Sequence, residues 1–121
     1  MNQIQALHTF WSGFGLKAYD ETSVPDSAEL PYITYEAGSD YFGHPMALSA
    51  SLWYRSSSWA GITEKEMQIA DFIGRGGRIL TYDGGALWIQ KASPWAQRMS
   101  EPSDDTIRRI VLNIQLEALQ T

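Results

Sequence analysis

The stretch from Ile62 to Lys91 constrains the fold of this chain more than any other. Thr63 and Glu66 have the spacing of a capping box, in which each side chain accepts a hydrogen bond from the other residue's backbone N–H. Ile62 and Met67 add the pattern of a hydrophobic staple. The sequence thus predicts a helix that begins near Thr63. Five residues supply its apolar face, namely Met67, Ile69, Ala70, Phe72 and Ile73.

A glycine break and a β-hairpin follow this helix. Gly74 has the position of a left-handed C-cap residue. Two apolar runs at 78–82 and 86–90 flank Asp-Gly-Gly at 83–85, a turn sequence that strongly favours a hairpin. The glycine-rich link 74–78 resembles a phosphate-binding loop. It follows a helix instead of preceding one, so a helix end and a link are the better interpretation.

Strand and helix patterns also divide the first half of the chain. Residues 4–14 carry apolar side chains at helical spacing, and 16–19 can form a short strand. A second strand is predicted at 32–36, which is rich in aromatic and β-branched residues. A long strand is predicted at 46–54, where Trp53 falls on the side opposite the larger apolar residues.

The last third of the chain is less regular. Residues 92–105 contain two prolines and are predicted to form a long loop. Residues 106–119 fit either a helix or a strand, and their β-branched content favours the strand. The order of elements predicts a single α+β domain over residues 1–121, with a mostly antiparallel sheet of about four to five strands and two helices packed on one face.

The composition excludes several kinds of function. A formal net charge of −5 opposes binding to nucleic-acid phosphates, and the chain has no cysteine. No apolar run has membrane-spanning length, and residues 1–14 lack the pattern of a signal peptide. His8 and His44 are the two histidines, and neither has a partner at metal-ligand spacing. His8 is expected to be packed and hydrogen-bonded. We therefore predict no metal, no cofactor and no enzyme activity.

The aromatic residues are the least ordinary feature of the sequence. Five tryptophans are present, and Trp59 and Trp95 lie in segments rich in turn formers. Trp53 and Trp88 are predicted to lie on the sheet face that points away from the helices. Such side chains are enriched at protein interfaces. A sugar-stacking platform and a simple lid over the core remain open as alternatives for Trp59 and Trp95.

The layout of the chain resembles the tail terminator and tail-completion proteins of long-tailed bacteriophages and prophages. The resemblance rests on an amphipathic first helix, LPYITY at 30–35, the long strand at 46–54, a helix that ends DFIG at 71–74, and a final strand beginning Arg108-Arg109. It spans nearly the whole chain and includes no sharp motif.

The resemblance implies a structural protein of the virion tail, made in the bacterial host cytoplasm. Family members form rings, typically hexameric, that cap the tail tube and meet the head connector. The partners would then be other copies of the chain, the tail tube protein and the head connector protein, with no sequence-specific contact to the DNA that passes through and no membrane contact. The residues predicted for its interfaces are Trp53, Trp88, Trp59, Trp95, Tyr41 and Phe42. The alternative is a monomeric module that binds a small molecule or glycan with exposed tryptophans.

Overall fold

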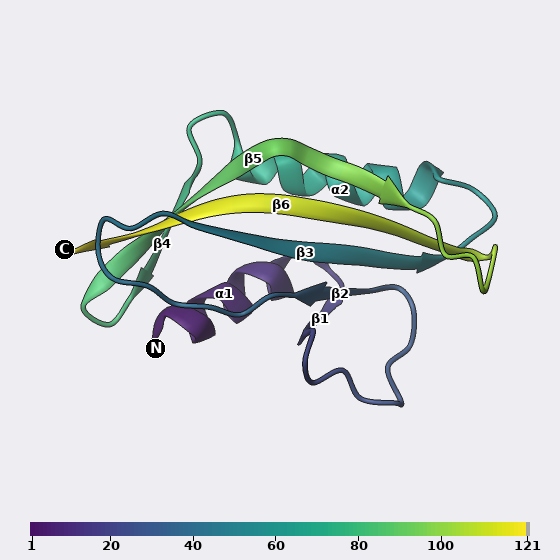
Figure 1. Ribbon diagram of the computed structural model, residues 1–121, viewed down its shortest axis with the longest axis horizontal. Coiled ribbons are helices and arrows are strands. Elements are labelled where there is room, and N and C mark those ends of the chain that lie inside the picture. Colours follow the sequence, from purple (N-terminus) through teal and green to yellow (C-terminus); the bar gives the residue numbers. More distant parts are fainter. Residues whose placement is uncertain (121) are drawn as a thin grey trace.

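The computed structural model describes residues 1–120 and shows a curled sheet with two short helices (Figure 1). The elements in chain order are α1 Gln3–Trp11, the 3-10 helix η1 Ser12–Phe14, β1 Lys17–Asp20, β2 Tyr32–Tyr35, β3 Met46–Arg55, α2 Ala60–Ile73, β4 Arg78–Tyr82, β5 Gly85–Met99 and β6 Ile107–Gln120.

The sheet is larger than predicted, and it is mixed. Its strand order is β1-β2-β3-β6-β5-β4, so the prediction of a mostly antiparallel sheet of four to five strands is wrong. The pair β1–β2 is parallel, and the other four pairs are antiparallel. The connection 21–31 runs back along the sheet to make the parallel pair possible, which its loop-like composition did not reveal. The layout stays broadly α+β, with two helices and one sheet.

Part of the predicted loop at 92–105 belongs to β5. The strand continues to Met99, and its pairing with β6 shifts register between Lys91 and Ala96. Pro94 lies inside this irregular stretch, so its lack of a backbone N–H removes no hydrogen bond between the two strands. The two prolines therefore marked a bulge and a shorter loop at 100–106, and the loop prediction is wrong for 92–99.

The start of α2 also differs from the prediction. The helix begins at Ala60, with Trp59 as N-cap residue, and the Trp59 side chain makes no capping hydrogen bond. Thr63 lies within the helix, where its N–H donates to the Trp59 carbonyl at 3.0 Å. The Met67 side chain is 57% exposed, so the predicted staple is wrong as well. Ser58 explains the earlier start, because its hydroxyl accepts from the Ala60 N–H at 3.0 Å.

Other sequence predictions are confirmed. The hairpin β4–β5 turns at the predicted glycines, and residues 107–120 form strand β6. Gly74 ends α2 with a φ of 73°, although its ψ of 179° differs from that of a left-handed cap. A complete capping box is present in α1, where Asn2 and Gln5 exchange side-chain-to-backbone hydrogen bonds of 2.9 Å.

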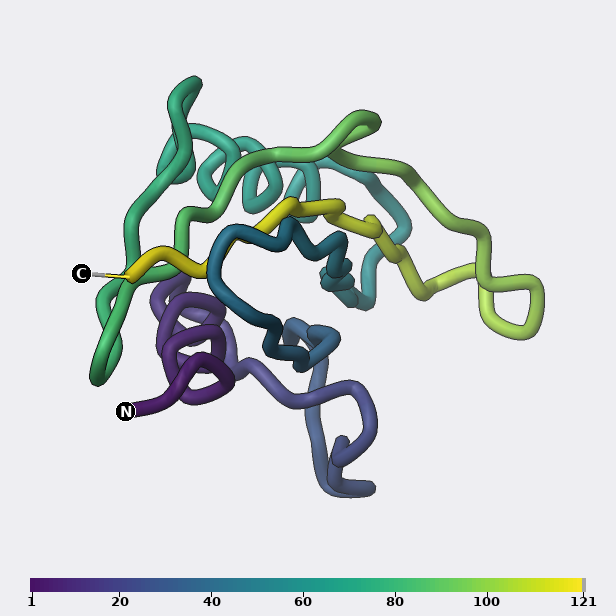
Figure 2. Tube along the Cα trace, turned by 60° about the vertical axis from the view of Figure 1, so that its left-hand side comes forward, coloured from purple at the N-terminus to yellow at the C-terminus, as the bar shows by residue number. Residues whose placement is uncertain are grey.

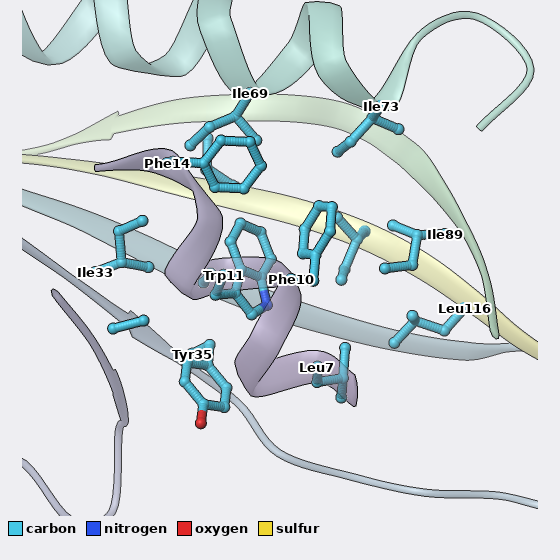
Figure 3. Packing of buried hydrophobic residues seen from close by; sticks show 14 of the residues in the cluster. Leu7, Phe10, Trp11, Phe14, Ile33, Tyr35, Ile69, Ile73, Ile89 and Leu116 are labelled. Atoms are coloured by element: carbon cyan, nitrogen blue, oxygen red, sulfur yellow. The ribbon is translucent and has the colours of Figure 1, made fainter. Parts of the chain in front are cut away.

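One hydrophobic core joins both helices to the sheet. Helix α1 contacts both edge strands, β1 and β4, and the sheet arches around it (Figure 2). Figure 3 shows aromatic side chains of α1 and η1 meeting aliphatic side chains of α2 and of the sheet. The buried residues labelled there are Leu7, Phe10, Trp11, Phe14, Ile33, Tyr35, Ile69, Ile73, Ile89 and Leu116. The core thus occupies one face of the sheet and leaves the other face outside.

Candidate assembly surfaces

Trp53 lies in a fixed polar network on the outer face of the sheet. Its indole N–H donates to the Thr34 hydroxyl at 2.9 Å, and the Arg109 guanidinium lies over its ring at 4.6 Å. Arg109 also donates from Nε to the Ser51 hydroxyl at 3.1 Å. Thr34 and Ser51 are buried although they point away from the core. The indole and the guanidinium are therefore held in place before any partner arrives.

Other polar groups of the outer face are paired within the chain. The Glu36 carboxylate accepts from both the backbone N–H and the hydroxyl of Ser49, each at 2.7 Å. Asn113 donates to the Pro94 carbonyl at 3.0 Å and to the Gln97 side chain at 3.1 Å. A face with side chains already ordered loses little conformational entropy when it binds another surface.

Trp88 fixes the link between α2 and β4. Its indole N–H donates to the Gly76 carbonyl at 2.9 Å. Gly77 lies beneath it with a φ of +86°, and a Cβ there would come within 2.5 Å of the Ile89 carbonyl oxygen and 2.7 Å of the Trp88 indole nitrogen. Only glycine fits this position. Ile79, the cross-strand neighbour of Trp88, is 54% exposed.

Trp53 and Trp88 share the outer face without forming one patch. Their partners on β6 are Arg109 and Glu117, which are eight residues apart along the strand. At a rise of about 3.3 Å per residue this separates the two tryptophans by about 26 Å. The sequence pattern assigned both side chains to the same face, and only the strand register shows how far apart they lie.

Trp59 and Trp95 are half-buried and pack against the core. The guanidinium groups of Arg98 and Arg108 lie 4.7 and 5.3 Å from the Trp59 ring centre. The Trp95 indole nitrogen is buried and has no hydrogen-bond partner among residues 1–120. Both side chains thus cover part of the core, and a role at an interface stays a prediction.

Tyr41 and Phe42 lie in a loop that the rest of the chain holds in place. Their side chains are 81% and 47% exposed. The Gln3 side chain donates to the Asp40 carbonyl at 3.1 Å and accepts from the Asp40 N–H at 3.3 Å. Phe42 also forms an isolated parallel bridge to Ala118 of β6. Exposed aromatic side chains on an anchored loop are suited to contact with another protein.

The histidines and acids show structural roles. His8 is exposed, and its Nδ1 lies 2.8 Å from the Tyr35 hydroxyl, so the prediction of a hydrogen-bonded histidine is confirmed and that of a packed one is wrong. Burial, aided by the charge of Asp20, raises the pKa of Tyr35. Two hydrogen bonds from Thr22 lower the pKa of Asp20.

Within residues 1–120, no three His, Cys, Asp or Glu side chains gather as a metal site, and no helix is long and apolar enough to cross a membrane.

Comparison with known proteins gives a likeness in fold to a solved structure. No family model matches the sequence, and no curated protein matches it. Among solved structures, a chain from the virion of a native gene transfer agent particle has a similar fold, with a TM-score of 0.54 and 20% sequence identity. The likeness covers 93% of this chain and 83% of that chain. This chain therefore has a fold that occurs in a component of a virion.

Proposed function

We propose that this chain is a structural, non-enzymatic subunit of a phage-like virion. The likeness in fold to a chain of a gene transfer agent virion carries the proposal, because it extends over 93% of this chain. The layout of the sequence independently resembles phage tail terminator proteins. One fold can serve several functions, so the role has to be tested on the particle itself.

We further propose that the chain acts in a ring at the end of the tail, between the tail tube and the head connector. Its exposed aromatic loop and its pre-ordered outer sheet face give it more than one surface for protein contacts. A ring needs two different complementary surfaces on each subunit. The net charge of −5 suits a wall that DNA passes without binding.

The structure gives less support to a glycan-binding module. Arg109 lies over the Trp53 ring, and Arg98 and Arg108 approach the Trp59 ring. A sugar would have to compete with these guanidinium groups for the aromatic faces. An open hollow of about 600 Å³ beside the start of α1 has no tryptophan in its lining.

Deleting the gene from a strain that produces the particles tests the proposal. We expect heads without attached tails, or tails of uncontrolled length, in negative-stain images, and rescue by a plasmid copy. Peptides of the chain should be present in purified wild-type particles, with immunogold label at the neck. Normal particles from the deletion strain, together with no peptides in wild-type particles, would refute a structural role.

A further inference from the structure

Two protruding segments of opposite charge lie at opposite sides of the molecule. One is the loop 21–31, which joins β1 to β2, and the other is the link 74–77, which joins α2 to β4. Figures 1 and 2 both place them on opposite sides of the molecule, with the link at the upper left and the loop at the bottom. Each segment adjoins an edge strand, because β1 and β4 are the two ends of the strand order.

The first corner, which we call the acidic end, comprises residues 17–31. It carries four acids, Asp20, Glu21, Asp26 and Glu29, against the single base Lys17. None of these side chains forms an ion pair within residues 1–120. The loop is anchored, since the Glu21 N–H donates to the Tyr35 carbonyl at 2.9 Å.

The edge strand of the acidic end is open to a partner. Lys17 and Tyr19 of β1 line two open hollows of about 440 and 540 Å³. Tyr19 packs edge-to-face on Tyr32 of the neighbouring strand, with the ring centres 5.6 Å apart. A partner that approaches this edge thus meets an ordered aromatic pair in a segment whose carboxylates have no ion-pair partner within residues 1–120.

The opposite corner, which we call the arginine end, comprises residues 72–82. It contains Arg75 and Arg78 and is flanked by two acids, Asp71 and Asp83. Asp83 pairs with the N-terminal amine, and neither arginine has an ion-pair partner among residues 1–120. The Arg78 guanidinium lies 4.0 Å from the centre of the Phe72 ring, and Phe72 is 44% exposed. Ile79 adds exposed apolar surface on the other side of β4.

We propose that the arginine end of one copy binds the acidic end of a second copy. This inference rests on the proposed function and names the surfaces through which the subunits would join. Charge complementarity favours a second copy, since the acidic end carries an excess of negative charge and the arginine end carries two arginines without ion-pair partners among residues 1–120. The two ends differ, so the contact is heterologous and repeats from copy to copy until a ring closes.

The exposed Phe72 and Ile79 at the arginine end and the half-buried tyrosine pair at the acidic end supply surface that the contact can bury. The charges would set orientation and register more than affinity. Self-association should therefore weaken as salt rises, because exposed charges more than about 10 Å apart are screened at 0.1 M ionic strength. Nucleic acid is a poorer occupant of the arginine end, because two arginines in a chain of net charge −5 supply few phosphate contacts.

Charge reversal at each end, followed by mixing, tests the inference by sedimentation velocity in low salt. The variants are Arg75→Glu with Arg78→Glu, and Glu21→Lys with Glu29→Lys. Each variant alone should self-associate at least tenfold more weakly than wild type. The 1:1 mixture should restore association, because each altered end then meets an end of opposite charge. Arg75→Glu alone should show the effect without loss of fold, since the Arg75 side chain makes no hydrogen bond within residues 1–120.

The matched control is Glu64→Lys with Glu66→Lys on α2, which changes the net charge as much as the acidic-end variant does. This control should associate as wild type does. A wild type that stays monomeric at every concentration, a mixture that stays dissociated, or single variants that assemble normally would each overturn the inference. A charge-reversal variant that no longer binds DNA but assembles normally would also overturn the inference. Variants that assemble normally would leave the proposed function standing, whereas absence of the chain from particles would refute that function directly.

Discussion

Replacing Gly77 with alanine should destabilise the protein far more than the same change at the neighbouring Gly76. The φ of +86° at Gly77 disfavours any residue with a Cβ, at a cost of about 1–2 kcal/mol. The new Cβ would lie 2.5 Å from the Ile89 carbonyl oxygen, so the link must move. That movement breaks the hydrogen bond from Trp88 to the Gly76 carbonyl, which is worth about 1 kcal/mol.

We therefore expect Gly77→Ala to lower the free energy of unfolding by about 2–3 kcal/mol, the sum of these contributions. Gly76→Ala is the matched control, because no heavy atom lies within 4 Å of its added Cβ. Its effect should stay within about 0.5 kcal/mol, as for other surface changes. Both substitutions are alanine for glycine in one link, so their effects on the unfolded chain should be similar.

Urea unfolding followed by tryptophan fluorescence measures both variants. The m value of a small protein is about 1–3 kcal/mol per molar urea, so Gly77→Ala should lower the midpoint by about 1–3 M. The measurement belongs in high salt, where self-association is weakest. Equal midpoints for the two variants would refute the close approach of Trp88 to this link.

Three further predictions concern Thr63, Tyr35 and Trp88. Thr63→Val should leave the free energy of unfolding unchanged or raise it by up to about 1 kcal/mol in urea unfolding, because the buried hydroxyl has no hydrogen-bond partner within residues 1–120. If Thr63 were the capping residue, the same change would lower that free energy by about 1 kcal/mol. The pKa of Tyr35 is raised in the fold, so its contribution to stability is present below the ordinary tyrosine value of 10.0 and is lost as the pH rises above it. The urea midpoint of Tyr35→Phe should therefore fall less steeply between pH 9 and 11 than that of wild type. An equally steep fall in both proteins would contradict this. Trp88→Ala should weaken self-association at least tenfold in sedimentation while circular dichroism stays native, and an unfolded variant would show that Trp88 belongs to the core.

The sequence predicted the elements whose signals are local. The Asp-Gly-Gly turn at 83–85 and the β-branched segment 107–120 gave correct strands. Predictions failed where a competing contact decided the outcome. The hydroxyl of Ser58 takes the place expected for the capping residue Thr63, so α2 begins one turn earlier. The prolines at the end of β5 suggested a loop because a bulge and a loop share the same composition.

The candidate surfaces were only partly visible in the sequence. Alternation along strand 46–55 correctly placed Trp53 on the outer face, opposite the core. The distance between Trp53 and Trp88 depends on the register of both strands with β6, which no local pattern encodes. The acidic run at 20–29 and the arginines of the link are plain in the sequence. Their positions at the two edges of one sheet follow from the strand order, a long-range feature that places β1 and β4 at its ends.

The wild-type chain's mass in solution tests the central claim most directly. Light scattering after size exclusion, at low and high protein concentration, would be combined with negative-stain images of any large species. The account predicts a discrete oligomer that grows in population with concentration and appears as a closed ring with a central opening. A monomer at every concentration, with no ring in any image, would contradict it.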